Sequence, residues 1–144
     1  MNFFFGNSTV NSMGRRLVRL LIVDDRSDYA DLLLELADMY HPEFEFACKL
    51  VEDATLVLEA VSDWKPNVVL VDLHVVDDPL DVVRRVSSYG SSVIVASETK
   101  IPELDVKISE SGGMGYVVKS SVLDDVETTL DYLGSVAQIA DFKH

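Results

Sequence analysis

Short apolar runs recur along the chain, and each is followed by a segment whose apolar residues have helical spacing. The runs read LVRLLIV, PEFEFACKL, VVLVDL, SVIVAS and GYVVK, at residues 17–23, 42–50, 68–73, 92–97 and 115–119. Short runs rich in Val, Ile and Leu are typical of strands that are buried on both faces. Five such strands alternating with helices predict an α/β fold. Right-handed crossovers then place helices on both faces of a parallel sheet.

The segments between the runs carry the signals of helix starts and ends. We expect helices over residues 25–40, 53–61, 80–88, 102–111 and 123–139. Pro42 lies just beyond the first of these segments, where a proline ends a helix. Asp53 stands where an N-cap is needed for the second.

Length and composition fit one globular domain. The chain has 144 residues, of which 48% are hydrophobic and 26% charged, a balance typical of folded proteins rather than of disordered ones. Residues 1–16 precede the first strand-like run, so we expect them to form an N-terminal extension. Residues 17–144 are then expected to form the domain.

The charge balance excludes some classes of partner. A net charge of −13 makes nucleic-acid binding by this chain alone unfavourable, because phosphate backbones require a basic face. No apolar run approaches the roughly 18 residues of a membrane span, and we expect no membrane partner. The single cysteine, Cys48, excludes an internal disulfide and fits a reducing compartment. These features predict a cytoplasmic protein.

Polar residues follow the apolar runs at the points where strands end. Asp24 and Asp25 follow the first run, Asp72 lies at the end of the third, Ser97 ends the fourth and Lys119 ends the fifth. In open parallel sheets, ligands bind beyond the carboxyl ends of the strands. These side chains are therefore expected to converge on one site.

Three converging carboxylates indicate a cation. Uncompensated carboxylates raise one another's pKa, and a hard divalent ion removes that cost. Mg²⁺ prefers carboxylate and carbonyl oxygens and keeps several waters, so two or three Asp ligands are sufficient. Asp72 is then a candidate nucleophile towards phosphorus, with Lys119 and Ser97 as donors to a carboxylate or a phosphoryl oxygen.

The stretches LLIVDD, VVLVDL, VIVAS and GYVVKS, taken together and in this order, resemble a receiver domain of the two-component response regulators. The resemblance covers roughly residues 17–139. It implies a flavodoxin-like, doubly wound, five-stranded parallel sheet with strand order 2-1-3-4-5 and five helices.

The resemblance also implies roles for the strand-end residues. Asp72 matches the phosphoacceptor of the family. Asp25 and Asp72 match its direct Mg²⁺ ligands, and Asp24 matches the acidic residue that binds the ion through water. The backbone carbonyl of His74 completes the implied ligand set.

Two further positions match the conformational switch of the family. Ser97 matches the switch hydroxyl, and Tyr116, three residues before Lys119, matches its aromatic partner. A tyrosine at this place can equally serve packing alone, so the sequence leaves both roles open for Tyr116.

Some positions depart from the family pattern. Lys119 is followed by Ser120 instead of the usual Pro, and the segment after Asp72 reads HVVDDPLDVV. That segment suggests a reshaped loop, with Asp77 and Asp78 adding negative charge near the phosphoryl site. The interval from Asp72 to Ser97 is a few residues short for the family, which suggests an abbreviated third helix. Glu98 stands where a small residue is usual. We expect its charge to slow phosphorylation by repelling an incoming dianion.

The function implied is a phosphorylation-driven switch, not an enzyme beyond its own phosphorylation and dephosphorylation. A sensor histidine kinase or a phosphotransfer protein would supply the phosphoryl group, and a downstream protein would read the result. One alternative is a pseudo-receiver that binds a protein without being phosphorylated. Another is a Mg²⁺-dependent phosphohydrolase, but its usual Asp-x-Asp at the first strand is missing here.

The final helix carries more apolar residues than one buried face requires. A stripe of Val122, Val126, Leu130, Leu133 and Ala137 suits packing on the sheet, whereas Leu123, Tyr132, Val136 and Ile139 lie outside it. We therefore predict a symmetric homodimer through this helix, with the FFF of the N-terminal extension packed nearby.

Overall fold

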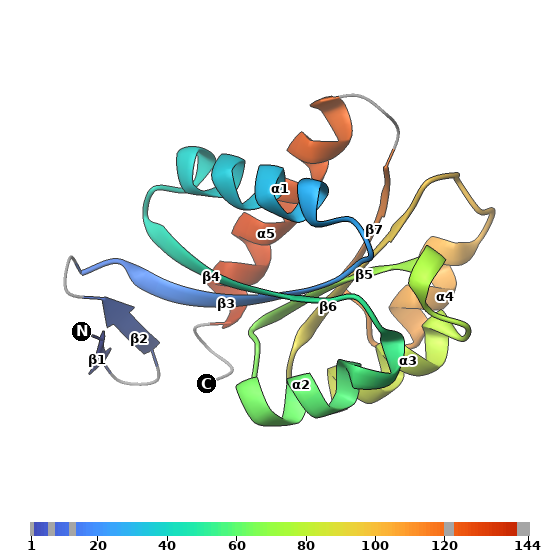
Figure 1. The fold of residues 1–144 in the computed structure, drawn as a ribbon, viewed down its shortest axis with the longest axis horizontal. Helices are drawn as coiled ribbons and strands as arrows, with labels where there is room; N and C mark the ends of the chain where they lie inside the picture. The colour runs from blue at the N-terminus through green and yellow to red at the C-terminus, as the bar shows by residue number, and fades with distance from the viewer. Residues whose placement is uncertain (1, 6–7, 12–13, 120–122, 141–144) are drawn as a thin grey trace.

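A computed structural model describes residues 2–5, 8–11, 14–119 and 123–140, and the side chains of residues 14–119 and 127–135. In this part of the chain a seven-stranded sheet is flanked by helices on both faces (Figure 1). The strands are β1 (Asn2–Phe5), β2 (Ser8–Asn11), β3 (Arg16–Val23), β4 (Phe44–Val51), β5 (Val68–Asp72), β6 (Ser92–Ser97) and β7 (Gly115–Val118). The α-helices are α1 (Ser27–Tyr40), α2 (Val57–Trp64), α3 (Pro79–Ser88), α4 (Leu104–Glu110) and α5 (Leu123–Ala140). Two short 3₁₀ turns, η1 (Ala54–Leu56) and η2 (Leu73–Val75), complete the elements.

Five of the strands are parallel, and β3 lies at their centre. It pairs with β4 along its whole length, and from Leu20 onward it pairs with β5 on its other side. Then β6 and β7 follow in order. Numbered along the chain, the five parallel strands have the order 2-1-3-4-5, so the doubly wound α/β prediction is confirmed.

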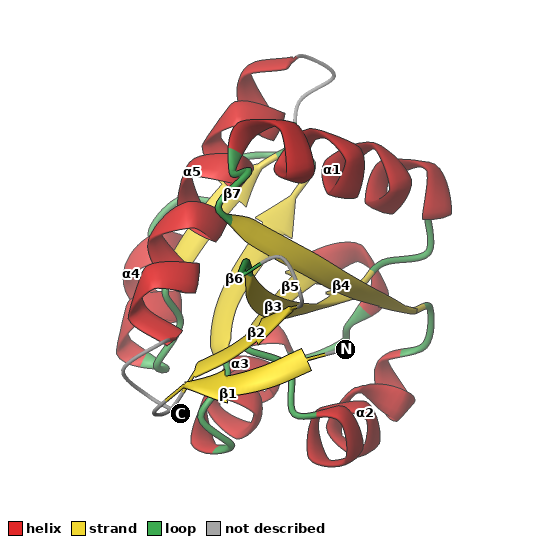
Figure 2. Ribbon diagram, turned by 90° about the vertical axis from the view of Figure 1, so that its left-hand side faces the viewer, coloured by secondary structure: helices red, strands yellow, loops and turns green. Residues whose placement is uncertain are grey.

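The N-terminal residues contribute a hairpin that the sequence did not predict as strands. Here β1 and β2 pair with each other in antiparallel fashion, and β2 meets β3 through the single register pair Val10↔Arg16. Figure 2 shows this hairpin at the end of the sheet where β3 begins. The expected extension therefore continues the sheet beyond the amino end of β3.

Alternate residues of each strand face opposite layers of helices. On one face, Leu20 and Ile22 pack in a cluster with Leu33 of α1 and with Leu130 and Leu133 of α5. On the other face, residues of β3, β5 and β6 pack against α2, α3 and α4, in a cluster that includes Leu21, Val71, Val93, Val61, Val83 and Ile108. Every residue of β5 and β6 is buried, as expected for strands covered on both sides.

Aspartate side chains cap the starts of two helical elements that follow strands of the sheet. Asp53 accepts a hydrogen bond from the backbone N–H of Thr55, so its predicted capping role is confirmed, although at η1, which precedes α2. Asp78 accepts from the N–H of Asp81 and caps α3, and Pro79 occupies the first helical position. The second acidic residue of the reshaped loop therefore has a capping contact.

The packing of α5 differs from the expectation on which the predicted dimer was based. Leu130 and Leu133 are fully buried, as the predicted stripe of α5 requires. Tyr132 was expected outside that stripe, yet it is half-buried and packs against the same core cluster, beside Gly115 of β7. The side chains of residues 122, 123, 126, 136, 137 and 139 lie outside those that the structure describes. Among the described helices, none is long and apolar enough to cross a membrane.

Candidate functional site

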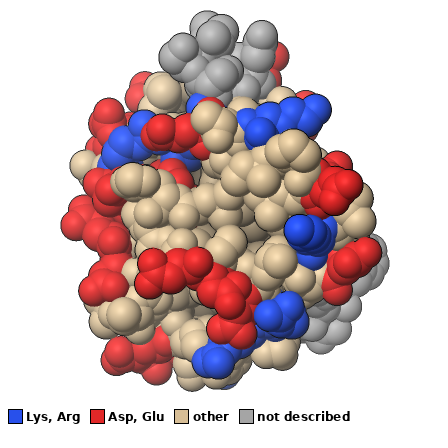
Figure 3. Space-filling view, turned by 90° about the vertical axis from the view of Figure 1, so that its right-hand side faces the viewer, with Lys and Arg blue, Asp and Glu red and all other residues tan. Residues whose placement is uncertain are grey.

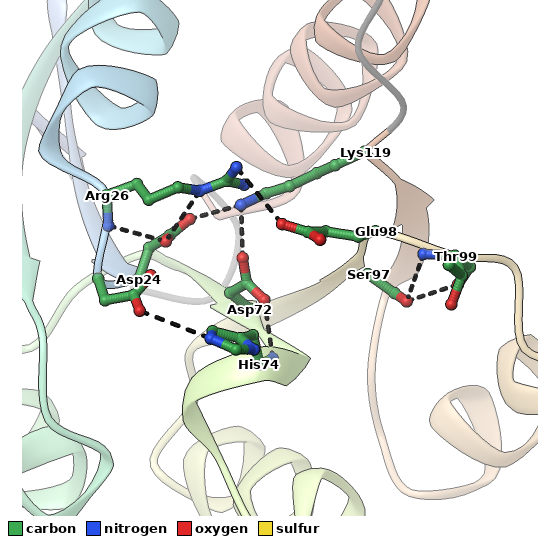
Figure 4. Close-up of polar contacts among 9 residues, drawn as sticks. Asp24, Arg26, Asp72, His74, Ser97, Glu98, Thr99 and Lys119 are labelled. Atoms are coloured by element: carbon green, nitrogen blue, oxygen red, sulfur yellow. Dashed lines mark hydrogen bonds and ion pairs between the residues drawn. The ribbon is translucent and has the colours of Figure 1, made fainter.

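Three polar side chains meet where the parallel strands end. Asp24 follows β3, Asp72 ends β5 and Lys119 follows β7, and their residues are only 1%, 3% and 7% exposed. The Lys119 ammonium donates hydrogen bonds to Oδ2 of Asp24 at 2.5 Å and to Oδ2 of Asp72 at 2.6 Å (Figure 4). The structure thus brings together three residues that the sequence analysis expected to converge.

The second oxygen of each carboxylate is held by the backbone. Oδ1 of Asp24 accepts from the N–H of Arg26 at 3.0 Å, and Oδ1 of Asp72 accepts from the N–H of His74 at 2.8 Å. Both bonds span two residues and form tight turns at the strand ends. Each carboxylate is therefore fixed between a backbone N–H and the lysine before any ligand arrives.

The two carboxylates share the Lys119 cation, but their pKa values shift in opposite directions. Burial raises the pKa of the Asp24 carboxyl, and the hydrogen bond and charge of Lys119 offset this only in part. Burial acts in the same direction on Asp72, but Lys119 and the His74 N–H outweigh it and hold the Asp72 pKa below its usual value. Asp72 is then ionised at neutral pH, as a nucleophilic carboxylate must be.

The aromatic ring of Tyr29 lies against the Lys119 ammonium, a contact that was not expected from the sequence. The Lys119 ammonium lies 4.1 Å from the centre of the Tyr29 ring, a cation–π distance. Tyr29 is in the first turn of α1 and packs against the core. An aromatic residue on the inward face of the first helix is the signal that could have suggested this contact.

Asp25 lies apart from the buried cluster. Its side chain is 48% exposed, and its Oδ2 lies 3.7 Å from Nε2 of His74, whose ring is also exposed. Within the part of the chain whose side chains are described, no group of three or more His, Cys, Asp or Glu residues is arranged to hold a metal ion. The carboxylate and carbonyl oxygens suit Mg²⁺ in chemistry. Their arrangement here, however, is that of two carboxylates around an ammonium group.

The hydroxyl of Ser97 is turned towards its own loop. Ser97 Oγ donates to the Thr99 carbonyl at 2.5 Å, and the Thr99 N–H donates to Oγ at 3.3 Å. The backbone of Ser97 does reach the site, since the Lys119 N–H donates to its carbonyl at 2.6 Å. The predicted switch serine is therefore adjacent to the cluster, but its hydroxyl is hydrogen-bonded elsewhere.

Tyr116 is tied to the same loop. Its hydroxyl donates to the Thr99 carbonyl at 3.0 Å and accepts from the Ile101 N–H at 3.1 Å. The Thr99 carbonyl thus accepts hydrogen bonds from both Ser97 and Tyr116. The two residues that were expected to act together are joined by one shared acceptor.

Arg26 and Glu98 form an ion pair beside the cluster of Lys119 and its two carboxylates. The Arg26 guanidinium lies 3.4 Å from Oε1 of Glu98 and 3.9 Å from Oδ1 of Asp24 (Figure 4). Glu98, which was expected to repel a dianion, therefore has Arg26 as a counter-ion that its sequence position did not indicate. The charge of Glu98 is therefore partly balanced. Figure 3 shows the face towards which the strands' carboxyl ends point, where acidic and basic side chains surround an uncharged centre.

Comparisons with known proteins agree on the architecture. The chain matches an orphan response regulator of H. pylori, HP1043, with a TM-score of 0.67 and 16% identity, over 83% of this chain and 96% of that one. It matches the response regulator domain of Thermotoga maritima CheB with a TM-score of 0.66 and 17% identity, over 88% and 97% of the two chains. The fold is that of a response regulator receiver domain.

A third similar structure contains a phosphorylated residue and a metal ion. It is a response regulator protein from Burkholderia pseudomallei with a phosphorylated aspartic acid, calcium ion and citrate. Its TM-score is 0.65 and its identity 19%, over 85% of this chain and 69% of that one. No protein-family model and no curated protein sequence matches the chain.

Proposed function

We propose that this chain is a phosphoacceptor receiver domain of a two-component response regulator, and that Asp72 accepts the phosphoryl group. The observation that carries the proposal is the buried cluster of Asp24, Lys119 and Asp72 at the carboxyl ends of the parallel strands β3, β7 and β5. A sensor histidine kinase or a phosphotransfer protein would be the donor. The phosphorylated aspartic acid of the structural neighbour from Burkholderia supports the same chemistry.

In the proposed reaction, a carboxylate oxygen of Asp72 attacks the phosphorus of a phosphohistidine. A P–O bond forms, the P–N bond breaks, and its electron pair stays on the departing imidazole nitrogen. The depressed pKa of Asp72 keeps the attacking group ionised. Lys119 is already within hydrogen-bond distance of both carboxylates, so positive charge is in place before the transfer.

We assign the Mg²⁺ ligands to Asp25, Asp72 and the backbone carbonyl of His74, with Asp24 acting through water. The ion supplies neutralisation of phosphoryl charge when it is bound. Asp24 and Asp72 already lie together, while Asp25 lies at the mouth of the site beside His74.

The switch would use the shared hydrogen bonds of Thr99. A phosphoryl group on Asp72 offers Ser97 a charged acceptor in place of the Thr99 carbonyl. Loss of the Ser97 bond changes the loop to which the Tyr116 hydroxyl is attached. Coupling of this kind shifts populations by about 1–3 kcal/mol, which is enough to change the affinity of a downstream protein for the α4, β7 and α5 surface.

Intact-mass spectrometry after incubation with acetyl phosphate and Mg²⁺ tests the proposal. We expect a gain of one phosphoryl group that is acid-labile, as an acyl phosphate is, and that is lost in Asp72→Asn. The matched control is Asp77→Asn, an exposed acidic residue five positions further on. Unchanged labelling of Asp72→Asn would refute the assignment.

One observation favours a second candidate, the pseudo-receiver. Lys119 donates to both Asp24 and Asp72, and Asp25 lies instead beside the exposed ring of His74, so the described residues do not form a ready metal site. A protein-binding module of this fold needs no metal. The absence of any labelling, together with no effect of Mg²⁺ on thermal stability, would favour this reading over phosphorylation.

The proposed setting follows from the donor. Sensor kinases present phosphohistidine in the cytoplasm, and we place the protein there. A net charge of −13 favours a protein as the downstream partner over nucleic acid. A homodimer through α5 belongs to the same proposal.

A further inference from the structure

Lys119 already serves two carboxylates before a phosphoryl group arrives. Its ammonium donates to Asp24 and Asp72 and rests against the Tyr29 ring, and its residue is 7% exposed. One positive charge is shared by two carboxylates, so the cluster already carries a net negative charge. A phosphoryl group adds about two more. Further positive charge from the protein would lower this cost.

Arg26 is placed to supply that charge. The N–H of Arg26 is fixed to Asp24 Oδ1, so the side chain leaves the backbone at the rim of the buried cluster. Its guanidinium passes within 6.0 Å of the centre of the same Tyr29 ring that supports Lys119. Figure 4 shows the side chain stretched across the site from the loop before α1 towards the loop after β6.

The present partners of Arg26 hold it loosely. The distances of 3.4 Å to Glu98 and 3.9 Å to Asp24 are those of ion pairs, longer than a charge-assisted hydrogen bond. The side chains of Arg26 and Glu98 are 44% and 62% exposed, so solvent screens the attraction. A guanidinium can instead bind two phosphoryl oxygens at once, in a planar, bidentate contact.

We propose that Arg26 is a second phosphoryl-binding cation and that Glu98 is its counter-ion in the unphosphorylated protein. The inference rests on the proposed function of Asp72. When the phosphoryl group is present, Arg26 exchanges Glu98 for phosphoryl oxygens. Glu98 directly follows Ser97 and precedes Thr99, so its release frees the loop that Ser97 and Tyr116 hold through the Thr99 carbonyl.

A double-mutant cycle with beryllofluoride and Mg²⁺, a non-covalent phosphoryl mimic, tests the exchange. The variants are Arg26→Gln, Glu98→Gln and the double variant, and affinity is measured by fluorine NMR. Arg26→Gln is expected to weaken binding about tenfold or more. Glu98→Gln is expected to strengthen it about two- to fivefold, because Arg26 no longer has a competing carboxylate.

The cycle separates exchange from simple repulsion. If Glu98 acts through Arg26, Glu98→Gln changes affinity less than about twofold in the Arg26→Gln background. An equal gain in both backgrounds means that Glu98 only repels the anion, and the inference is wrong. Arg26→Lys keeps the charge without the bidentate geometry and should bind between Arg26→Gln and the unmodified protein.

Arg85→Gln is the matched control for the loss of one exposed arginine. Arg85 pairs with Asp81 on α3 at 3.0 Å and is 61% exposed, and this variant should bind beryllofluoride as the unmodified protein does. Failure of the inference and failure of the proposed function give different results. If Asp72 is labelled by acetyl phosphate but Arg26→Gln binds normally, only the inference is wrong. If the unmodified protein neither binds beryllofluoride nor is labelled, both are wrong.

Discussion

At the scale of single residues, the site buries two carboxylates together with one ammonium group. Lys119 balances Asp24 and Asp72 within one buried cluster, and its ammonium also lies 4.1 Å from the centre of the Tyr29 ring. A buried ion pair is costly to break by removing one partner, because the other charge is left uncompensated. The exposed pair of Arg26 and Glu98 has the opposite property and can open at little cost.

Cys48 provides a residue-scale prediction that is independent of the site. Burial, with a smaller contribution from the charge of Asp31, raises the pKa of the Cys48 thiol to about 11. The folded protein therefore holds the thiol proton more tightly than the unfolded chain. This contribution to stability is full below the unfolded pKa of about 8.5 and is lost as the pH rises towards 11.

The rate of alkylation by iodoacetamide as a function of pH checks this shift. We expect slow modification of the folded protein at pH 8 and a rate that rises towards pH 11. In urea the rate should rise near the ordinary thiol pKa. A midpoint of about 8.5 in the folded state would contradict the shift.

The residues of the cluster could be predicted from sequence more readily than their contacts. Asp24, Asp72 and Lys119 each follow a recognisable apolar run, and strand ends fix where their Cα atoms lie. The direction of a long side chain is set by its surroundings, so the position of Lys119 between two carboxylates did not follow from spacing. Arg26 escaped notice because its role depends on Glu98, which is distant in sequence and close only in the fold.

At the scale of elements, the loops after the strands position the site, and their caps hold the loops. The segment after β5 reads HVVDDPLDVV, and the sequence led us to expect Asp77 and Asp78 to act on the electrostatics of the site. Asp78 instead accepts a hydrogen bond from the N–H of Asp81 at the start of α3. Asp77, by contrast, is exposed.

Replacing these two neighbours by alanine should separate capping from charge. Asp78→Ala is expected to lower the free energy of unfolding by about 1 kcal/mol, because the N-terminus of α3 loses its side-chain acceptor. Asp77→Ala removes the same charge without a cap and should change it by less than about 0.5 kcal/mol. Urea denaturation of both variants is the measurement. Equal losses would show that charge, not the cap, accounts for the effect of Asp78.

Strands with continuous apolar runs and helices with regular apolar spacing were predicted, and elements without either pattern were missed. The buried runs of β3, β5 and β6 stand out because tertiary structure covers both of their faces. The hairpin of β1 and β2 was not recognised, since its sequences NFFF and STVN do not resemble the Val- and Leu-rich runs of the parallel strands. Helix α1 begins at Ser27, two residues after its predicted start, because the Asp24 turn uses the intervening backbone.

At the scale of the whole molecule, the open question is association. The homodimer was predicted from apolar residues of α5 beyond one buried stripe. Of these, Tyr132 is partly accounted for by packing within the monomer, which leaves less apolar surface for a partner than expected. The prediction now depends on the terminal turns of α5 and on the apolar N-terminal segment, whose side chains are outside the described part of the chain.

Sedimentation velocity at tens of micromolar protein tests this association. We expect a dimer that is weakened by Ile139→Asp and by removal of residues 1–12, because each change takes apolar surface from a self-complementary patch. Asp131→Asn, an exposed change on the same helix, serves as the control. A monomer under these conditions, with and without beryllofluoride, would rule out the dimer.

The eight residues of β3 separate the N-terminal hairpin, at the start of the strand, from the cluster of Asp24, Asp72 and Lys119 at its end. A strand of that length spans about 25 Å, so a label or surface tether attached at the hairpin stays clear of the phosphoryl chemistry. The same spacing suits energy transfer between a dye at the hairpin and one on the loop after β6. A change in transfer efficiency would report movement of that loop relative to the hairpin.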